Sequence, residues 1–302
     1  MNALRAHPAV AAAALVAAWI SVPGIVSAQE YAKWYQQSER HFLELKQKAG
    51  GGTKMTWDKL PDWTGIWARE GGTRFDPKVP NYDPKTTAKL TPVYQAKFDK
   101  KLAEQKKGIE WDSLSYCLPA GFPRWLTEPF LREFIVRPEE VWGINEQQSE
   151  ARRIYTDGRG HVPEDEAYPL WEGDSIGFWD GDTLVVHTIN NKEGQYNRGQ
   201  PDYSDKVSVV EKMRKVNTNT IEDDITVYDP LSLVEPWHVV NRFVRVTTSN
   251  LRINMWSCEE NNNVVKTSDG VTQFILKGEK GYKDPNTLIS GPEEPQTPKE
   301  KR

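Results

Sequence analysis

From about residue 125 to residue 257 the chain is a succession of short segments in which apolar and polar residues alternate. Few folds accommodate such a pattern. The segments are rich in Val, Ile, Thr and aromatic residues, and turn residues separate them at short intervals, which is typical of strands joined by hairpins. The predicted strands are Phe134–Arg137, Val141–Asn145, Arg153–Thr156, Ser175–Trp179, Thr183–Ile189, Val207–Val216, Thr220–Tyr228, His238–Thr247 and Leu251–Ser257.

Consecutive hairpins without intervening helices indicate an antiparallel up-and-down meander. Asp180-Gly181 predicts one tight two-residue turn within it, because such turns need positive φ. An open sheet of this size would expose unpaired backbone groups at its edges, so closure is favoured. We therefore predict a mainly β protein whose meander closes as a barrel, with a sandwich as the alternative.

Two peripheral helices are predicted before the meander. Residues 29–52 carry an apolar stripe at helical spacing, and the glycines at 50–52 end it. Thr91 as N-cap and Pro92 at the first helical position predict a second helix near residues 91–107, inserted into a barrel domain that spans residues 53–282. The stripe of the first helix consists of Tyr31, Trp34, Tyr35, Ser38, Phe42 and Leu45.

The N-terminal residues 1–28 have the plan of a secretory signal peptide. Arg5 precedes an apolar run at residues 9–20, and small residues surround Ala28. The run is shorter than the roughly 20 residues that a membrane span requires. We expect a periplasmic or secreted protein without a transmembrane span. The tail at 283–302 is rich in Pro, Glu and Lys and is expected to be disordered.

Cys117 and Cys258 are the only cysteines of the chain. In an oxidising compartment this pair predicts one disulfide, the alternative being two separate buried thiols. Neither cysteine has the spacing of a metal ligand, and no cofactor motif is present, so no metal or cofactor is assigned. The net charge of −4, without a basic patch, argues against a nucleic-acid partner.

Several ordered motifs between residues 60 and 265 resemble an uncharacterised family of secreted bacterial proteins. The resemblance implies export but no particular activity. This chain differs from the family's usual pattern at His187, where Asp is commoner, and around His161. The motifs are C-L-P-A-G-F-P-R at 117–124, R-I-Y-T-D-G-R-G-H at 153–161, G-D-S-I-G-F-W-D-G-D-T-L-V-V at 173–186, D-P at 229–230 with P-W at 236–237, and C-E-E-N-N at 258–262.

A shorter motif, Gly65-Ile66-Trp67, is similar to the Gly-x-Trp of calycins, the lipocalins and fatty-acid-binding proteins. This likeness implies a lipocalin-like barrel with an interior wide enough for one small ligand. The chain contains 12 tryptophans, which either fill a β core or line such a pocket. Trp67, Trp179 and Trp237 are candidate ligand contacts, and Arg124 is a candidate polar anchor.

Two candidate catalytic groups contain a histidine. Counting back from the predicted Asp180-Gly181 turn places Asp174 opposite His187, where a carboxylate would orient a general base; a surface pair is the alternative. Asp157, Arg159 and His161 form the second group, in a glycine-containing loop after a strand. Loops at strand ends often carry function, although Asp-Gly is also an ordinary turn.

Three carboxylates are further candidates for ligand binding. Glu211 and Asp223 share strand parity with apolar neighbours, which points them inward unless a β-bulge turns them out, with Arg214 or Arg242 as possible partners. Glu259 follows Cys258 at a strand end.

Three functions remain open at this point. The first is binding of a small apolar or aromatic molecule in the barrel. The second is a cofactor-independent hydratase, lyase or hydrolase that uses His161 or His187 as base. The third is an envelope-associated interaction protein. A pocket containing a histidine beside a carboxylate would favour the enzyme, and an apolar pocket with one polar anchor would favour the binding protein.

Overall fold

The computed structural model describes residues 28–81, 83, 85–107, 112–254, 258, 264–266, 272–275 and 278–282. The predicted disordered tail and Glu259 lie outside the described residues, as does the predicted signal peptide except for Ala28.

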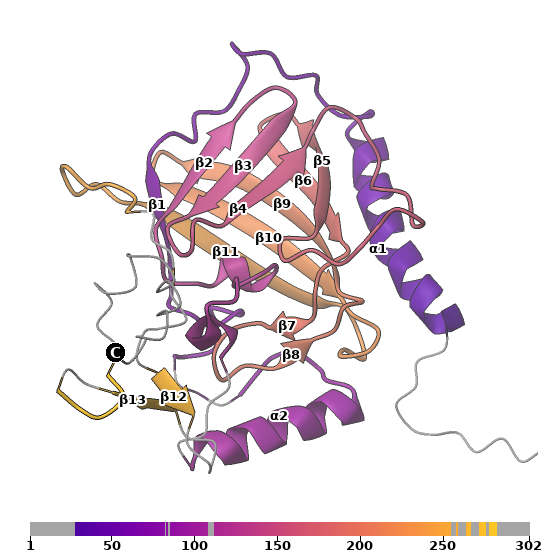
Figure 1. Ribbon diagram of the computed structural model, residues 1–302. Helices are drawn as coiled ribbons and strands as arrows, with labels where there is room; N and C mark the ends of the chain where they lie inside the picture. The colour runs from indigo at the N-terminus through magenta and orange to yellow at the C-terminus, as the bar shows by residue number, and fades with distance from the viewer. Residues whose placement is uncertain are drawn as a thin grey trace, which may run out of the picture.

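Nine strands close into a barrel in the order β1-β11-β10-β9-β6-β5-β4-β3-β2, with two α-helices outside it among the described residues (Figure 1). This confirms the predicted mainly β fold and is consistent with a lipocalin-like barrel. The barrel strands are β1 (Ile66–Arg69), β2 (Arg132–Val136), β3 (Glu140–Asn145), β4 (Ala151–Tyr155), β5 (Asp174–Asp180), β6 (Thr183–Ile189), β9 (Ser208–Asn217), β10 (Thr220–Tyr228) and β11 (Trp237–Arg245).

The barrel departs from the predicted meander at three places. Strands β4 and β5 pair in parallel, because the long loop between them returns the chain before β5 begins. The β5–β6 turn lies one residue further along than predicted: Asp180 pairs with Thr183, so residues 181–182 form its centre. The described part of the predicted strand 251–257, residues 251–254, contains no strand.

Helix α1 (Ala28–Lys48) packs along the outer face of β6, β9 and β10 (Figure 1). Its Phe42 is buried in an apolar cluster on that face, with its ring 5.3 Å from that of Phe178. Helix α2 (Pro92–Gln105) has Thr91 as N-cap and Pro92 at its first position, as predicted. It packs against the short hairpin of β7 (Gly194–Gln195) and β8 (Asp202–Tyr203).

Aromatic side chains fill much of the barrel interior. Trp63 is fully buried and lies edge-on to Trp179, with ring centroids 5.7 Å apart, and also to Phe134 at 5.7 Å. The indole of Trp67 donates a hydrogen bond to the carbonyl of Trp63 at 3.0 Å. Such geometry is typical of a packed aromatic core. Trp67 and Trp179 are therefore core residues in this conformation.

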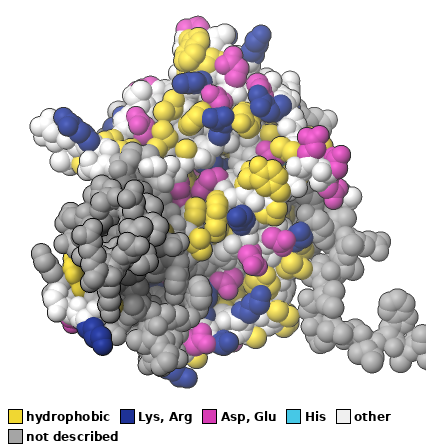
Figure 2. Space-filling model, viewed as in Figure 1, with side chains coloured by type: hydrophobic (Ala, Val, Ile, Leu, Met, Phe, Trp, Pro, Cys, Tyr) yellow, Lys and Arg dark blue, Asp and Glu magenta, His cyan; other side chains and the backbone are white. Residues whose placement is uncertain are grey.

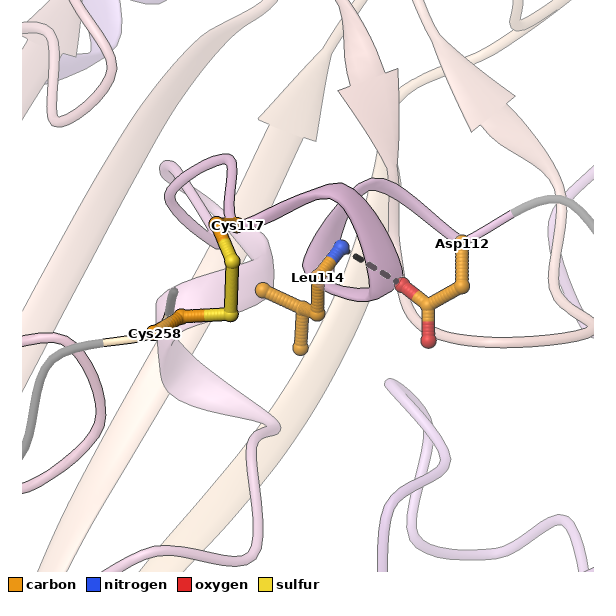
Figure 3. Close-up of a disulfide and its surroundings, with 4 residues drawn as sticks. All are labelled: Asp112, Leu114, Cys117 and Cys258. Carbon is orange, nitrogen blue, oxygen red and sulfur yellow. Dashed lines mark hydrogen bonds between the residues drawn. A yellow bond between two sulfur atoms is a disulfide. The ribbon is translucent and has the colours of Figure 1, made fainter. Parts of the chain in front are cut away.

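A disulfide joins Cys117 to Cys258, as predicted (Figure 3). It anchors the 3₁₀ turn η1 (Ser113–Tyr116), whose first turn is capped by the Asp112 carboxylate accepting from the Leu114 amide at 3.1 Å. A second 3₁₀ turn, η2 (Arg124–Leu126), follows with all three side chains buried. The segment from 112 to 131 thus packs at one end of the barrel.

Candidate functional site

One layer of the barrel interior is polar, and each of the nine strands contributes one side chain to it. None of these side chains is more than 9% exposed, and several of them are opposed in register or hydrogen-bonded to a neighbour in the wall. We call this set the polar layer. Its members are Arg69, Arg132, Asn145, Arg152, Ser175, Thr188, Glu211, Asp223 and Asn241.

The polar layer confirms the inward orientation of Glu211 and Asp223 that strand parity predicts. The β9–β10 pairing is regular at both residues, so the alternative of a β-bulge is wrong. The predicted partners Arg214 and Arg242 are wrong as well. Arg242 pairs with a glutamate on the outside of the barrel, and Glu211 pairs with Arg152.

On one side of the polar layer the charges are compensated. Arg152 donates to both carboxylate oxygens of Glu211, one at 2.8 Å, and to the Thr188 hydroxyl at 2.8 Å. Burial and the adjacent Glu211 carboxylate raise the pKa of Asp223 well above its ordinary value, which favours its protonated form. Arg152 therefore pairs with Glu211 alone, and the two carboxyl oxygens of Asp223 are unpaired within the described protein.

On the other side two buried arginines have no carboxylate within ion-pairing distance among the described residues. Arg132 donates to the carbonyls of Trp125 at 2.6 Å and Glu128 at 2.7 Å, while its Nε and Nη1 have no partner within the described protein. Arg69 donates to backbone carbonyls and, at 2.8 Å, to the Asn241 side chain, and its Nε is unpaired. The unpaired donors extend to the side-chain amides of Asn145 and Asn241.

The electrostatics of these two arginines follow from burial without a counter-charge. Burial lowers the pKa of Arg69 to about 10, against the opposing effect of Asp76. For Arg132, burial and then repulsion by Arg69 lower the pKa to about 9. The Arg132 guanidinium lies 4.9 Å from the ring centroid of Trp125 and 5.0 Å from that of Phe243. Aromatic faces attract a cation but supply no hydrogen-bond acceptor of carboxylate strength.

A pocket of about 800 Å³ opens beyond η2 at the same end of the barrel. Arg124 lies at its base and is paired with Glu128 and, at 2.8 Å, with Asp112. The Glu128 carbonyl that accepts from Arg132 belongs to the segment that separates this pocket from the polar layer. Its lining includes Arg74, Asp112, Arg124, Glu128, Phe130, Gln147, Asn197 and Arg198.

A second pocket, of about 570 Å³, lies between α2 and the β7–β8 hairpin. Aromatic side chains of Tyr94, Trp171 and Tyr203 form part of its wall. Near Tyr203, the buried carboxyls of Glu150 and Glu172 have raised pKa values because of burial; that of Glu150 rises to about 7. The described linings of both pockets contain no histidine.

The candidate histidines lie outside the barrel wall. Asp174 is opposed to Ile189, so the predicted pairing with His187 is wrong. The actual partner lies two residues further along β6 than predicted, and residues two apart on a strand face the same side, so Asp174 and His187 both face outward. His161 joins them: its Nδ1 lies 2.9 Å from Asp174 Oδ2 and its Nε2 lies 3.0 Å from His187 Nδ1. His187 Nε2 lies 3.1 Å from Ser38 Oγ of α1.

The pKa values of His187 and Asp174 follow from burial and from their contacts with His161. Burial and then the neighbouring His161 lower the pKa of His187 to about 3. Burial opposes ionisation of Asp174, but hydrogen bonds from His161 and the Val162 amide outweigh it and hold its pKa below the ordinary value. His187 is therefore neutral near pH 7, and it is 1% exposed.

The predicted cluster of Asp157, Arg159 and His161 is divided in the structure. Arg159 binds the Asp157 carboxylate with its Nη2 at 2.6 Å and stacks 4.0 Å from the Tyr155 ring, as a half-exposed surface pair. His161 instead contacts Asp174 and His187 on the outer face of the barrel. The ligand contact predicted for Trp237 stays a prediction; its ring packs 4.9 Å from Phe75.

Comparison with models of known protein families gives no match for this chain, and comparison with curated proteins gives none either. None of the described helices is long and apolar enough to cross a membrane. On the face shown in Figure 2, the Lys and Arg side chains are interspersed with Asp and Glu.

The arginines and amides of the polar layer are the residues that the sequence analysis missed. Arg132 and Arg152 precede the predicted starts of their strands, and Arg69 follows the segment identified around Trp67. The available signal was strand alternation, because residues two positions apart on a strand face the same side. Arg132 has the same parity as the inward Phe134, and Asn241 the same parity as the inward Phe243.

Proposed function

We propose that the protein binds a small molecule inside the barrel, at the polar layer. The observation that supports this is the set of unpaired buried donors there. A barrel interior that served stability alone would be filled with apolar side chains, because unpaired buried polar groups cost free energy. A small-molecule site typically combines apolar and aromatic walls with a few convergent polar groups, which is the composition of this interior.

Binding is better supported than catalysis. The enzymatic alternative assigns the base to His161 or His187. Both lie on the outer face of the barrel, with His187 buried beneath α1 and His161 in contact with His187, and neither lines the two pockets described above. Ser38, beside His187, is fully buried and offers a substrate no access. The interaction-protein alternative leaves the polar layer without a role.

The proposed location is the periplasm or the exterior. The Cys117–Cys258 disulfide supports an oxidising compartment. Membership of the uncharacterised secreted family also stays a proposal, carried by the motifs of the sequence alone.

Native mass spectrometry of the protein purified from an oxidising compartment tests the binding function. We expect a bound small molecule that is released on denaturation. Replacing donors of the polar layer by apolar groups of similar size, as in Asn145→Leu and Asn241→Leu, should abolish the adduct. Arg242→Met, which alters the outer face next to Asn241, should retain it. An adduct that survives in both asparagine variants would place the ligand elsewhere and contradict the proposal.

A further inference from the structure

We infer that the ligand is an organic anion whose carboxylate is held by Arg69 and Arg132, with the Asn145 and Asn241 amides completing the site. This inference rests on the proposed binding function and adds the chemical class of the ligand. It starts from the two buried guanidiniums that lack a counter-charge within the described chain.

The chain itself shows how it compensates a buried arginine that has a structural role. Arg152 is held by both oxygens of Glu211, and Arg124 is held between Asp112 and Glu128. Both are as deeply buried as Arg132. Arg69 and Arg132 differ because they donate to neutral oxygens only. A buried cation of this kind is stabilised by an anion from outside the chain.

On this side of the polar layer the unpaired atoms are all donors: the Nε of Arg69, the Nε and Nη1 of Arg132, and the Nδ2 of Asn145 and Asn241. The other unpaired atoms of the layer, the carboxyl oxygens of Asp223 and the Nε of Arg152, belong to the side that contains Glu211. The donors on the Arg132 side come from β11, β1, β2 and β3, which are consecutive around the barrel wall. Arg132 and Asn145 are directly opposed in the β2–β3 ladder. The Nη2 of Arg132 is occupied by two carbonyls, so its free Nε or Nη1 can donate one hydrogen bond to a carboxylate oxygen, and Arg69 and the two amides supply the further donors.

The surroundings favour an organic anion over an inorganic one. Trp125 and Phe243 flank the Arg132 guanidinium and offer aromatic surface to the body of a ligand. On the far side of η2, the pocket of about 800 Å³ reaches Gln147, whose backbone amide donates to the Asn145 side chain at 3.1 Å. The lining of that pocket does not include Arg132, so the segment 124–131 must move for the body of a ligand held at Arg132 to occupy it.

Matched pairs of carboxylate and amide test the inference. Indole-3-acetate with indole-3-acetamide and hexanoate with hexanamide are titrated into the full-length mature protein, and binding is followed by calorimetry and thermal shift, with sodium sulfate as the inorganic reference. We expect a carboxylate to bind at least tenfold more tightly than its amide. Arg132→Met and Asn145→Leu should each remove that preference, and Arg242→Met should keep it. Two substitutions are used so that the test survives if one variant misfolds.

The outcomes separate the two proposals. Equal binding of carboxylate and amide, lost in Asn145→Leu, overturns the anion inference and leaves the binding function intact. Stabilisation by sulfate equal to that by the carboxylates, and dependent on Arg132, overturns the organic part of the inference. If no probe binds and native mass spectrometry shows no adduct, the binding function itself fails. If Arg132→Met still binds the carboxylates more tightly than the amides, the anion binds elsewhere and the proposed site is wrong.

Discussion

His161 Nε2 and His187 Nδ1 lie 3.0 Å apart on the outer face of the barrel, and the other nitrogen of His187 lies 3.1 Å from Ser38 of α1. The contact links the loop after β4 to the N-terminal helix through a strand of the barrel wall. Because only one ring nitrogen of a neutral imidazole carries a proton, the chain of contacts holds when His187 is neutral. The docking of α1 is therefore coupled to the protonation of a buried histidine.

Acidification should weaken the contribution of His187 to stability. Its pKa is about 3 in the folded protein and about 6.5 when unfolded, so the unfolded chain binds more protons between these values. Stability contributed by the neutral ring is complete above pH 6.5 and is lost as pH falls, by up to about 1.4 kcal/mol per pH unit. Asp174, whose pKa is also lowered, adds a loss in the same direction only below its ordinary value, 3.8.

Comparison with His187→Gln isolates this effect from the buried acids, since a raised pKa such as that of Glu150 acts in the opposite direction. Free energies of unfolding are measured by urea denaturation between pH 4 and 7.5. We expect the advantage of the wild type over the variant to shrink as pH falls below 6.5. A difference that stays constant across the range would show that His187 does not titrate in this way.

Phe42 should hold α1 against the barrel. Phe42 is 4% exposed, its ring stacks on His187 with centroids 5.5 Å apart, and it lies tilted against Phe178 with centroids 5.3 Å apart. Truncation of a buried Phe costs about 3–5 kcal/mol, but here the loss is confined to helix docking. In Phe42→Ala we expect faster hydrogen exchange over residues 36–48 and unchanged exchange in β10. Leu43→Ala, at a side chain that is 51% exposed, is the control and should leave both unchanged.

Glu211→Gln should be strongly destabilising, by about 3–5 kcal/mol, because it removes the carboxylate to which Arg152 is hydrogen-bonded, and Asp223 makes no hydrogen bond to Arg152. The matched control is Glu222→Gln, which breaks the exposed Arg242–Glu222 pair and should cost less than about 1 kcal/mol. Chemical denaturation at pH 7 compares the two. Similar losses in both variants would mean that the buried pair has no special role in the interior.

Local pattern was sufficient for much of the fold. The bounds of β6 and β10 agree with those predicted, because turn residues delimit both ends of each alternating run. The contacts within the polar layer could not be predicted from the sequence, for a physical reason. Arg152 meets Glu211 across 59 residues of sequence, and only closure of the barrel brings them together. Parity indicates which side of a strand a residue faces, but not which strand lies opposite.

Reduction of the disulfide should destabilise the protein by up to about 5 kcal/mol, because the Cys117–Cys258 link closes a loop with a sequence separation of 141. Urea denaturation with and without dithiothreitol measures the loss. The Cys117→Ser/Cys258→Ser variant should behave as the reduced protein does and should not respond to the reductant. If the double variant unfolds with the same free energy as the oxidised wild type, the disulfide does not stabilise the protein by restricting the unfolded chain.

Arg132 and Arg152 occupy the same layer, yet the same substitution should affect them differently. Arg152→Met leaves the Glu211 carboxylate unpaired and should cost about 3–5 kcal/mol. Arg132→Met loses two hydrogen bonds to carbonyls but also removes a buried charge that no carboxylate of the described chain compensates. These effects oppose each other, so we expect its free energy of unfolding to stay within about 1 kcal/mol of the wild type without ligand. Equal losses in the two variants would indicate that Arg132 is a structural residue like Arg152, whereas the predicted asymmetry would show that the stability of the fold does not depend on the Arg132 charge, as the proposed ligand site requires.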